Sequence, residues 1–383
     1  MIGSSGSILK SWRIWFVLTG LLALVTITLL ISVTSNTTAT SPFFGDPALY
    51  EQSMERLFSG QIPYIDFPFE HMPLSILPMA VTYLLARASG VSFVLIFGFV
   101  SFALLFATGE VVVRISAKVG VSGAGMVWVW LVAPILPLVM YRIDALSVLL
   151  ASGSVLLALQ HREAGSIAAA FGGIFAKGWP VVLAASDWWR GKHRSAVVLF
   201  GGTALFGAAM LALPGFRSGR QFEGIHQETL IGALVATGRG IVGGNLHLAD
   251  AAGAVYIEVG QWAVLVTLAI GGALAISALL ALHFRFSWPG SLSLTAALTF
   301  ALILGSPLLS AQFLLWPMPF VAIVGSQKTR IALSVAGGMS MLLVGYWLPG
   351  ATSWHAFVVA RNVVLVVAAV SALWDLRRLV QRP

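Results

Sequence analysis

The sequence predicts an all-α integral membrane protein: a polytopic bundle of about twelve transmembrane helices, with a short amphipathic helix in an outer loop. Of the 383 residues, 58% are hydrophobic and only 9% are charged, and the mean hydropathy is +0.93. Soluble domains carry about 25% charged residues and cannot bury this much apolar surface in one core. Long apolar segments recur along the whole chain, so we expect a single integral-membrane domain over residues 1–383.

Twelve segments are apolar enough and, at about 17–25 residues, long enough to cross a bilayer. The first is too long for a signal-peptide core, and we expect it to remain as a membrane anchor. The fourth, ninth and tenth segments are short or contain prolines, so about ten to thirteen spans fit the sequence. The predicted spans are 14–33, 73–89, 91–113, 122–140, 144–160, 164–185, 195–213, 258–282, 290–305, 308–324, 331–349 and 355–374.

The basic residues predict the sidedness of these spans, because cytoplasmic loops are enriched in Lys and Arg. With both termini in the cytoplasm, the larger set lies inside: Lys10, Arg13, Arg87, Arg142, Arg190, Lys192, Arg194, Arg285, Lys328, Arg330, Arg377, Arg378 and Arg382. The smaller set lies outside: Arg56, Arg114, Lys118, Arg162, Arg217, Arg220 and Arg239. The net charge of +8 is therefore interpreted as a topology signal at the plasma membrane, and we expect no nucleic-acid partner.

Two loops on the outer side, at about 34–72 and 214–257, are long enough to hold a site. The first contains five of the 14 acidic residues. Within it, Asp46-Pro47 is a strong helix start, since Asp caps and Pro suits the first turn. Apolar residues then recur every three to four positions until Ser59-Gly60, which predicts an amphipathic helix lying on the outer membrane surface.

Asp46 is the candidate catalytic residue of this loop. A helix cap is the simpler interpretation of its side chain, and the two roles are compatible because a capping carboxylate keeps a second oxygen free. Asp66 and Glu70 follow in a stretch whose three prolines stiffen the path back to the membrane. Such acids suggest a site, although solvated loop charges are also common.

The first outer loop resembles that of polyprenol-phosphate-sugar-dependent glycosyltransferases of the GT-C superfamily, family 87 type, which includes actinobacterial α-mannosyltransferases. The shared pattern comprises Gly45, Asp46, Tyr50, Leu57, Gly60, Pro63, Tyr64, Asp66, Phe67, Glu70, Pro73 and Leu74. Further stretches similar to these enzymes follow in order: Lys177-Gly178-Trp179-Pro180, His226-x-Glu228 and Ser310-x-Gln312-Phe313-x-x-Trp316.

The resemblance implies an inverting transfer of one sugar, mannose above all, from a polyprenyl phosphate to a lipid-linked or cell-envelope glycan acceptor on the outer face. Asp46 would act as the general base. The substrate-binding candidates are Tyr50, Tyr64, Asp66, Glu70, His71, His226, Glu228, Gln312 and Trp316.

Two basic residues fall inside predicted spans, where a charge is costly and usually functional. Arg361 lies about two turns from the outer end of the last span and could bind the donor phosphate. Lys177 lies deeper; it could also serve the phosphate, or it could pair with Glu110 or Asp144. Asp46, Asp66, Glu70 and His71 could ligate a metal, but their spacing is not diagnostic, and we expect no metal and no cofactor.

Other functions remain open at this point. A transporter or lipid-linked sugar flippase would also have about twelve spans, but we find no internal repeat of the kind common in transporters. A related enzyme acting with another sugar, such as an arabinofuranosyltransferase or an aminosugar transferase of the lipid-A type, would share the architecture. A catalytically silent scaffold of a cell-envelope assembly is the third alternative.

Overall fold

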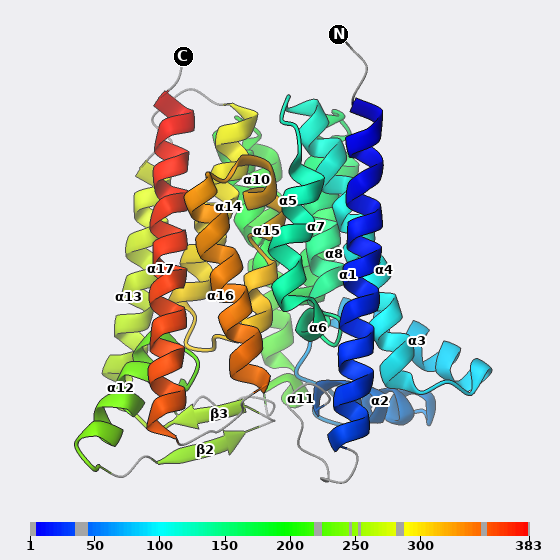
Figure 1. The fold of residues 1–383 in the computed structure, drawn as a ribbon, viewed down its shortest axis with the longest axis vertical. Helices are drawn as coiled ribbons and strands as arrows, with labels where there is room; N and C mark the ends of the chain where they lie inside the picture. The colour runs from blue at the N-terminus through cyan, green and yellow to red at the C-terminus, as the bar shows by residue number, and fades with distance from the viewer. Residues whose placement is uncertain are drawn as a thin grey trace.

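The computed structural model describes residues 5–34, 45–217, 224–244, 247–251, 254–280, 287–345 and 351–381. Both termini lie at the same end of a helical bundle, which we call the N-terminal end (Figure 1). The opposite end, called the loop end, carries the amphipathic helix α2 and a small sheet. The all-α class is therefore confirmed, with this sheet as an addition that the sequence analysis did not predict.

The helices of the first half are α1 (Ser5–Thr34), α2 (Gly45–Phe58), η1 (Pro73–Ser75), α3 (Ile76–Ser89), α4 (Phe93–Lys118), α5 (Ala124–Val132), η2 (Ala133–Ile135), α6 (Leu136–Val139), α7 (Asp144–Leu159) and α8 (Glu163–Lys177). The amphipathic helix ends where the sequence predicts, because Gly60 adopts the left-handed conformation (φ 96°) that glycine favours. Prolines divide the predicted span 122–140 into α5, η2 and α6.

The second half contains η3 (Trp179–Val182), α9 (Leu183–Trp189), α10 (His193–Ala212), α11 (Pro214–Arg217), α12 (Leu230–Ile241), α13 (Gln261–Leu279), α14 (Trp288–Gly305), η5 (Ala311–Leu315), α15 (Met318–Val324), α16 (Gln327–Gly345) and α17 (Thr352–Gln381). The sheet has the order β1-β3-β2 and is antiparallel throughout. Its strands are β1 (Ile225–His226), β2 (Leu248–Ala251) and β3 (Ala254–Ile257).

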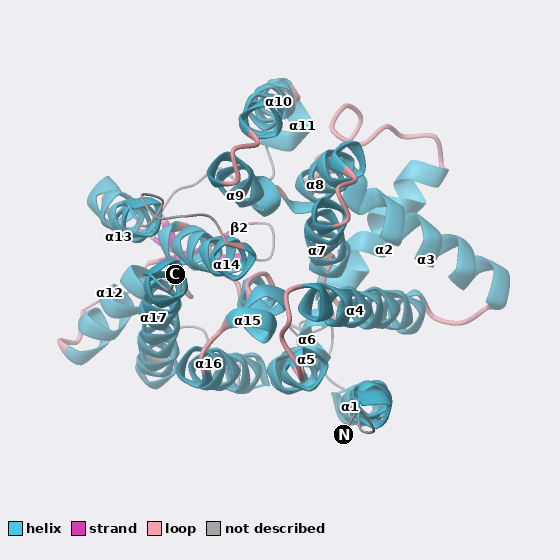
Figure 2. Cartoon of the chain, turned by 90° about the horizontal axis from the view of Figure 1, so that it is seen from above, coloured by secondary structure: helices cyan, strands magenta, loops and turns pink. Residues whose placement is uncertain are grey.

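Five helices of the described residues are long and apolar enough to cross a membrane by themselves, namely Phe93–Lys118, His193–Ala212, Gln261–Leu279, Trp288–Gly305 and Thr352–Val380. Several of the other helices are shorter, such as α3, or broken, such as α5, η2 and α6. Seen from above, α14 and α15 lie centrally, whereas α1, α10 and α13 lie at the periphery (Figure 2). The central position of α14 agrees with its burial, since it is the most buried and the least apolar of these five helices.

The predicted span 73–89 is wrong as a crossing. Helix α3 has 14 residues, about 21 Å at 1.5 Å per residue, whereas a bilayer core is about 30 Å thick. Its C-terminal Arg87 forms an ion pair with Glu55 of α2, with 3.3 Å between Nη2 and Oε1. Both ends of α3 therefore lie at the loop end, and Figure 1 shows α3 projecting sideways there.

This missing crossing reverses the predicted sides of the next four loops, those that carry Arg87, Arg114, Arg142 and Arg162. Glu110 of α4 pairs with Arg13 of α1, so the C-terminal end of α4, with Arg114 and Lys118, lies at the N-terminal end. Arg142 pairs with Asp46 and therefore lies at the loop end. These placements are the opposite of the predicted ones.

The predicted span 164–185 does not cross either, because the chain turns back within it. From α10 onward the loops therefore lie at the ends that the sequence predicts. Helix α8 ends at Lys177, Gly178 turns the chain with φ 78°, and η3 and α9 return towards the N-terminal end. Glu163 at the start of α8 consequently lies 3.4 Å from Lys192 at the start of α10. Among the described residues, the N-terminal end carries more Lys and Arg side chains than predicted. Arg87 and Arg142 lie at the loop end instead, whereas Arg114, Lys118 and Arg162 lie at the N-terminal end.

Single cysteines test this arrangement without background, because the chain has none of its own. We expect Ser59→Cys and Ser89→Cys to react with a membrane-impermeant maleimide from the same side, and Arg162→Cys from the other side. All three positions are exposed. Labelling of Ser89→Cys and Arg162→Cys from one side would contradict the non-crossing α3.

Candidate active site

Asp46 lies in the first turn of α2, at the loop end of the bundle. Its carboxylate forms an ion pair with Arg142 and accepts a hydrogen bond from the Tyr50 hydroxyl at 3.1 Å. Burial alone would raise the pKa of Asp46, but Arg142 and His71 hold it below its usual value. Burial also keeps the pKa of Tyr50 well above its usual value, so its hydroxyl stays protonated and donates. Asp46 is thus an ionised carboxylate with 36% of its side chain exposed.

Glu228 comes from the second long outer loop, between β1 and α12. Its Oε2 lies 3.3 Å from Nη2 of Arg361, which also donates to the Glu228 carbonyl at 2.9 Å. Asn362 donates to the same carbonyl at 2.9 Å, and Thr229 caps α12 through Gly232 N–H. These contacts fix the loop to α17. Arg361 is fully buried, so it holds Glu228 in this structure and has no exposed surface for a lipid phosphate.

Arg142 forms the ion pair with Asp46 and was missed as a site residue by the sequence analysis. Burial raises the pKa of Glu228, and both Arg361 and Arg142 offset that rise, whereas Arg142 also lowers the pKa of Asp46. Asp46 is the carboxylate that Arg142 contacts, whereas Glu228 is held by Arg361. The sequence does carry a signal for it: Arg142 and Asp144 are two charges between apolar segments that a proline-rich break separates.

Asp144 lies two residues further on, at the start of α7, and is buried. Lys177 pairs with it at 3.6 Å, as one of the predicted alternatives had it, whereas Glu110 pairs with Arg13. The indole N–H of Trp316 donates to Asp144 at 2.7 Å. Lys177 also lies 5.6 Å from the centre of the Phe313 ring. Lys177 and Trp316 therefore belong to one buried polar cluster.

The stretch from Tyr64 to His71 forms a pinned loop. Tyr64 has a left-handed backbone (φ 68°), and its hydroxyl donates to the His71 carbonyl at 2.6 Å. Asp66 accepts the N–H of Ile62 at 2.6 Å and so closes a turn. His71 lies edge-on to Tyr50, with 5.3 Å between ring centres, and its Nε2 lies 3.8 Å from Glu70. His71 and Glu70 therefore lie beside Tyr50 and Asp46, whereas the contacts of Tyr64 and Asp66 shape the loop.

The remaining predicted residues lie deeper. His226 is buried in β1. Its backbone N–H donates to the Pro307 carbonyl at 3.0 Å, and its imidazole ring lies edge-on to Tyr256. Gln312 is buried in η5, with its Oε1 beside the Ser310 hydroxyl. None of these contacts tests a role in binding sugar, which stays a prediction.

An apolar groove of about 510 Å³ lies between α9, α10, α13 and α14. Gly271 and Gly305 bring α13 and α14 so close that a Cβ on Gly271 would come within 2.4 Å of the Gly305 Cα. The groove extends to Ser306 and Pro307, just past the end of α14 at the loop end. Because Pro307 bonds to His226, the groove ends against the strand that precedes Glu228.

Within the described parts of the chain, no group of three or more His, Asp or Glu side chains is arranged to hold a metal ion. Comparisons with family models, with curated proteins and with solved structures find no match to this chain.

The Asp46–Arg142 pair makes a prediction about pH. Because the folded-state pKa of Asp46 lies below its usual 3.8, the pair stabilises the fold above that pH. The contribution is lost as the pH falls through the lowered pKa. We expect the melting temperature of the wild type to exceed that of Asp46→Asn by a constant margin from about pH 7 to 5. Below pH 3.8 the margin shrinks; a margin that widens in acid would contradict the ion pair.

Proposed function

We propose that this protein is a membrane glycosyltransferase that moves one sugar, mannose in the expected case, from a polyprenyl phosphate to a lipid-linked or cell-envelope acceptor. The observation that carries the proposal is the Asp46–Arg142 ion pair at the loop end, a partly exposed carboxylate held beside a buried cation. A lipid-facing groove ending near Glu228 supports a donor with a long apolar tail. The basic excess at the N-terminal end supports a plasma-membrane orientation with cytoplasmic termini and an extracytoplasmic site.

In the proposed reaction the acceptor hydroxyl oxygen attacks the anomeric carbon of the donor sugar. The new C–O bond forms as the bond to the phosphate oxygen breaks, which inverts the configuration. The hydroxyl proton passes to the Asp46 carboxylate, and the electron pair of the broken bond leaves with the polyprenyl phosphate. The leaving phosphate gains negative charge, which a nearby cation stabilises in the transition state. The proposal includes no cofactor.

Arg142 is the cation we assign to that phosphate, because it lies directly beside the proposed base Asp46. Lys177 and Arg361, the residues expected from sequence, are held by Asp144 and Glu228. Arg142 instead pairs with Asp46, which is partly exposed. A donor phosphate that attracts Arg142 weakens its pair with Asp46, and the pKa of Asp46 then rises. The base therefore becomes stronger when the donor is bound, which couples donor binding to proton transfer.

The groove gives the first test of the donor class. A Cβ on Gly272, which lines the groove, meets no atom within 4 Å, so Gly272→Leu fills the groove without disturbing the helix contact made by Gly271. We expect this variant to raise KM for a long-chain polyprenyl donor roughly tenfold, the factor for expelling about two methylene groups from an apolar site. KM for a donor of two isoprene units is expected to stay unchanged.

Gly207→Leu is the matched control. Gly207 also has open space around it and lies on α10, but it does not line the groove. We expect wild-type kinetics with both donors. Equal KM values of Gly272→Leu and Gly207→Leu for the long donor would contradict tail binding in this groove.

One observation favours a transporter instead. The chain breaks inside the bundle at Gly178, where Lys177 meets Asp144, and broken helices with interior charges are common at transport sites. A transporter would move the lipid-linked sugar across the bilayer without forming a new glycosidic bond. Product formation therefore separates the two functions.

A further inference from the structure

A second polar site lies at the N-terminal end of the bundle, across the membrane from Asp46. Four elements meet there: the loop after α7, the start of α8, the turn after α9 and the start of α10. They enclose a pocket of about 80 Å³, room for a group the size of a few water molecules. Seven of its nine lining residues are polar or charged, namely His161, Glu163, Ser166, Asp187, Arg190, Lys192 and Ser195.

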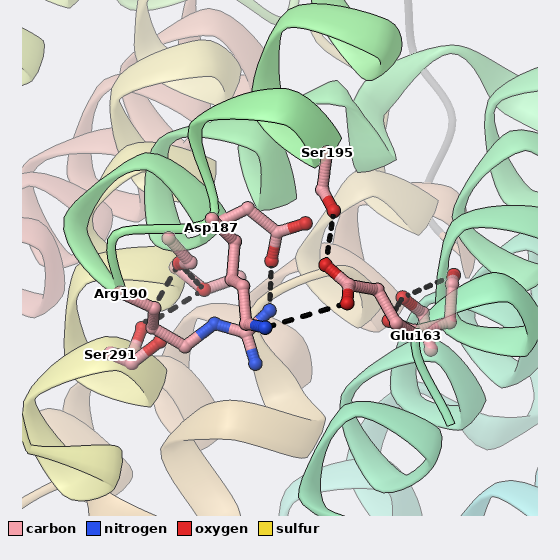
Figure 3. A network of polar contacts seen from close by, with 10 residues as sticks. Glu163, Asp187, Arg190, Ser195 and Ser291 are labelled. Carbon is pink, nitrogen blue, oxygen red and sulfur yellow. Dashed lines mark hydrogen bonds and ion pairs between the residues drawn. The ribbon is translucent and has the colours of Figure 1, made fainter. Parts of the chain in front are cut away.

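The charged side chains of this pocket form two ion pairs, Arg190 with Asp187 and Lys192 with Glu163. Figure 3 shows Arg190 beside Asp187 and the Ser195 hydroxyl beside Glu163. The Ser195 hydroxyl donates to Glu163 at 3.0 Å, and Lys192 lies 3.4 Å from the same carboxylate. Glu163 thus places a negative group at the N-terminus of α10, a helix of 20 residues whose first N–H groups attract anions.

Donor groups remain in this pocket after these pairs are counted. The Nε of Arg190 is buried and has no acceptor among the described residues. Lys192 carries three donors on its ammonium group, and its contact with Glu163 occupies one of them. Arg162 and Arg194 are exposed and adjoin the lining residues Glu163 and Ser195 in sequence, so they add positive charge near this end. This donor set suits an oxyanion with several acceptor oxygens.

The depth of the pocket identifies the source of such an anion. Trp188 is 49% exposed and lies edge-on to His193, and exposed tryptophans mark the membrane–water interface. Basic pockets between helix ends at this depth bind phospholipid head groups. We propose that this pocket binds the phosphate of an anionic phospholipid, in the leaflet opposite the proposed transfer site. The phosphate replaces the Glu163 carboxylate at the start of α10.

Equilibrium binding of a radiolabelled short-chain phosphatidic acid to the purified protein in neutral detergent tests this site. We expect saturable binding that Lys192→Gln weakens about fivefold, the factor for one basic residue at an anionic surface. Glu163→Gln is expected to tighten binding by a similar factor, because it removes the competing carboxylate. Arg377→Gln, an exposed basic position at the same end on α17, is the control and should leave binding unchanged.

The opposite signs of the two variants distinguish a site from a structural clamp. If the network only holds the helices together, Glu163→Gln weakens binding as Lys192→Gln does, and the proposal is overturned. Equal losses in Arg377→Gln overturn it as well, because binding then follows net charge. Competition by millimolar inorganic phosphate, with no preference for the lipid, overturns the lipid as the natural ligand.

Discussion

Replacing Asp46 with asparagine is expected to lower sugar transfer by about 10²–10⁴-fold, the range that a general base contributes. The amide keeps the size of the side chain and its ability to accept from Tyr50, but it cannot take the acceptor proton. The protein should still insert into the membrane, since α2 lies outside the spans. The measurement is kcat with saturating donor and acceptor, on protein quantified after purification.

Glu51→Gln is the matched control, because it removes a carboxylate from the same helix at a position without an ion pair among the described contacts. Arg142→Gln separates the roles further. We expect it to raise KM for the donor and to lower kcat, since Arg142 serves the phosphate and tunes Asp46. Activity of Asp46→Asn within tenfold of the wild type would remove Asp46 as the base.

The second large effect concerns the Glu228–Arg361 pair. Removing one partner of a buried pair leaves an uncompensated charge and costs about 3–5 kcal/mol. We expect Glu228→Gln to destabilise the fold by that amount, because Arg361 is fully buried. The double variant Glu228→Gln with Arg361→Met is expected to recover most of the loss. Thermal unfolding of the purified protein in detergent measures both.

Arg377→Gln on the same helix serves as a control, since this residue is exposed near the other end of α17 and should change stability little. A Glu228→Gln variant as stable as the Arg377→Gln control would mean that the pair does not hold the second outer loop. If the double variant recovers its stability but not its sugar-transfer activity, Glu228 or Arg361 has a role in the reaction itself.

Local patterns allowed much of the fold to be predicted. Asp46-Pro47 and Ser59-Gly60 gave the bounds of α2, because capping and chain termination depend on nearby residues. Most long apolar segments form helices for the same reason. The predicted crossing at 73–89 was wrong, because an apolar segment can lie in lipid without spanning the bilayer. Helix α3 is too short to span it, and the Arg87–Glu55 ion pair keeps its C-terminal end beside α2.

The site was predictable only in part, because its partners are far apart in the chain. Glu228 and Arg361 are separated by 133 positions, and Asp144 and Trp316 by 172. A single sequence indicates that buried charged residues need partners, but it does not identify those partners. Arg142 was predicted at the wrong end of the bundle because the false crossing at 73–89 reversed the loops that follow it. A topology error of one span is therefore enough to conceal a site residue.

The most direct test of the central claim uses the purified protein reconstituted in vesicles with a radiolabelled polyprenyl-phosphate mannose and cell-envelope lipid acceptors. The label is followed both into a new lipid-linked glycan and across the bilayer. We predict label in the glycan product with the wild type and none with Asp46→Asn. Movement of the intact donor across the membrane, without a new glycosidic bond, would contradict a glycosyltransferase and favour the transporter.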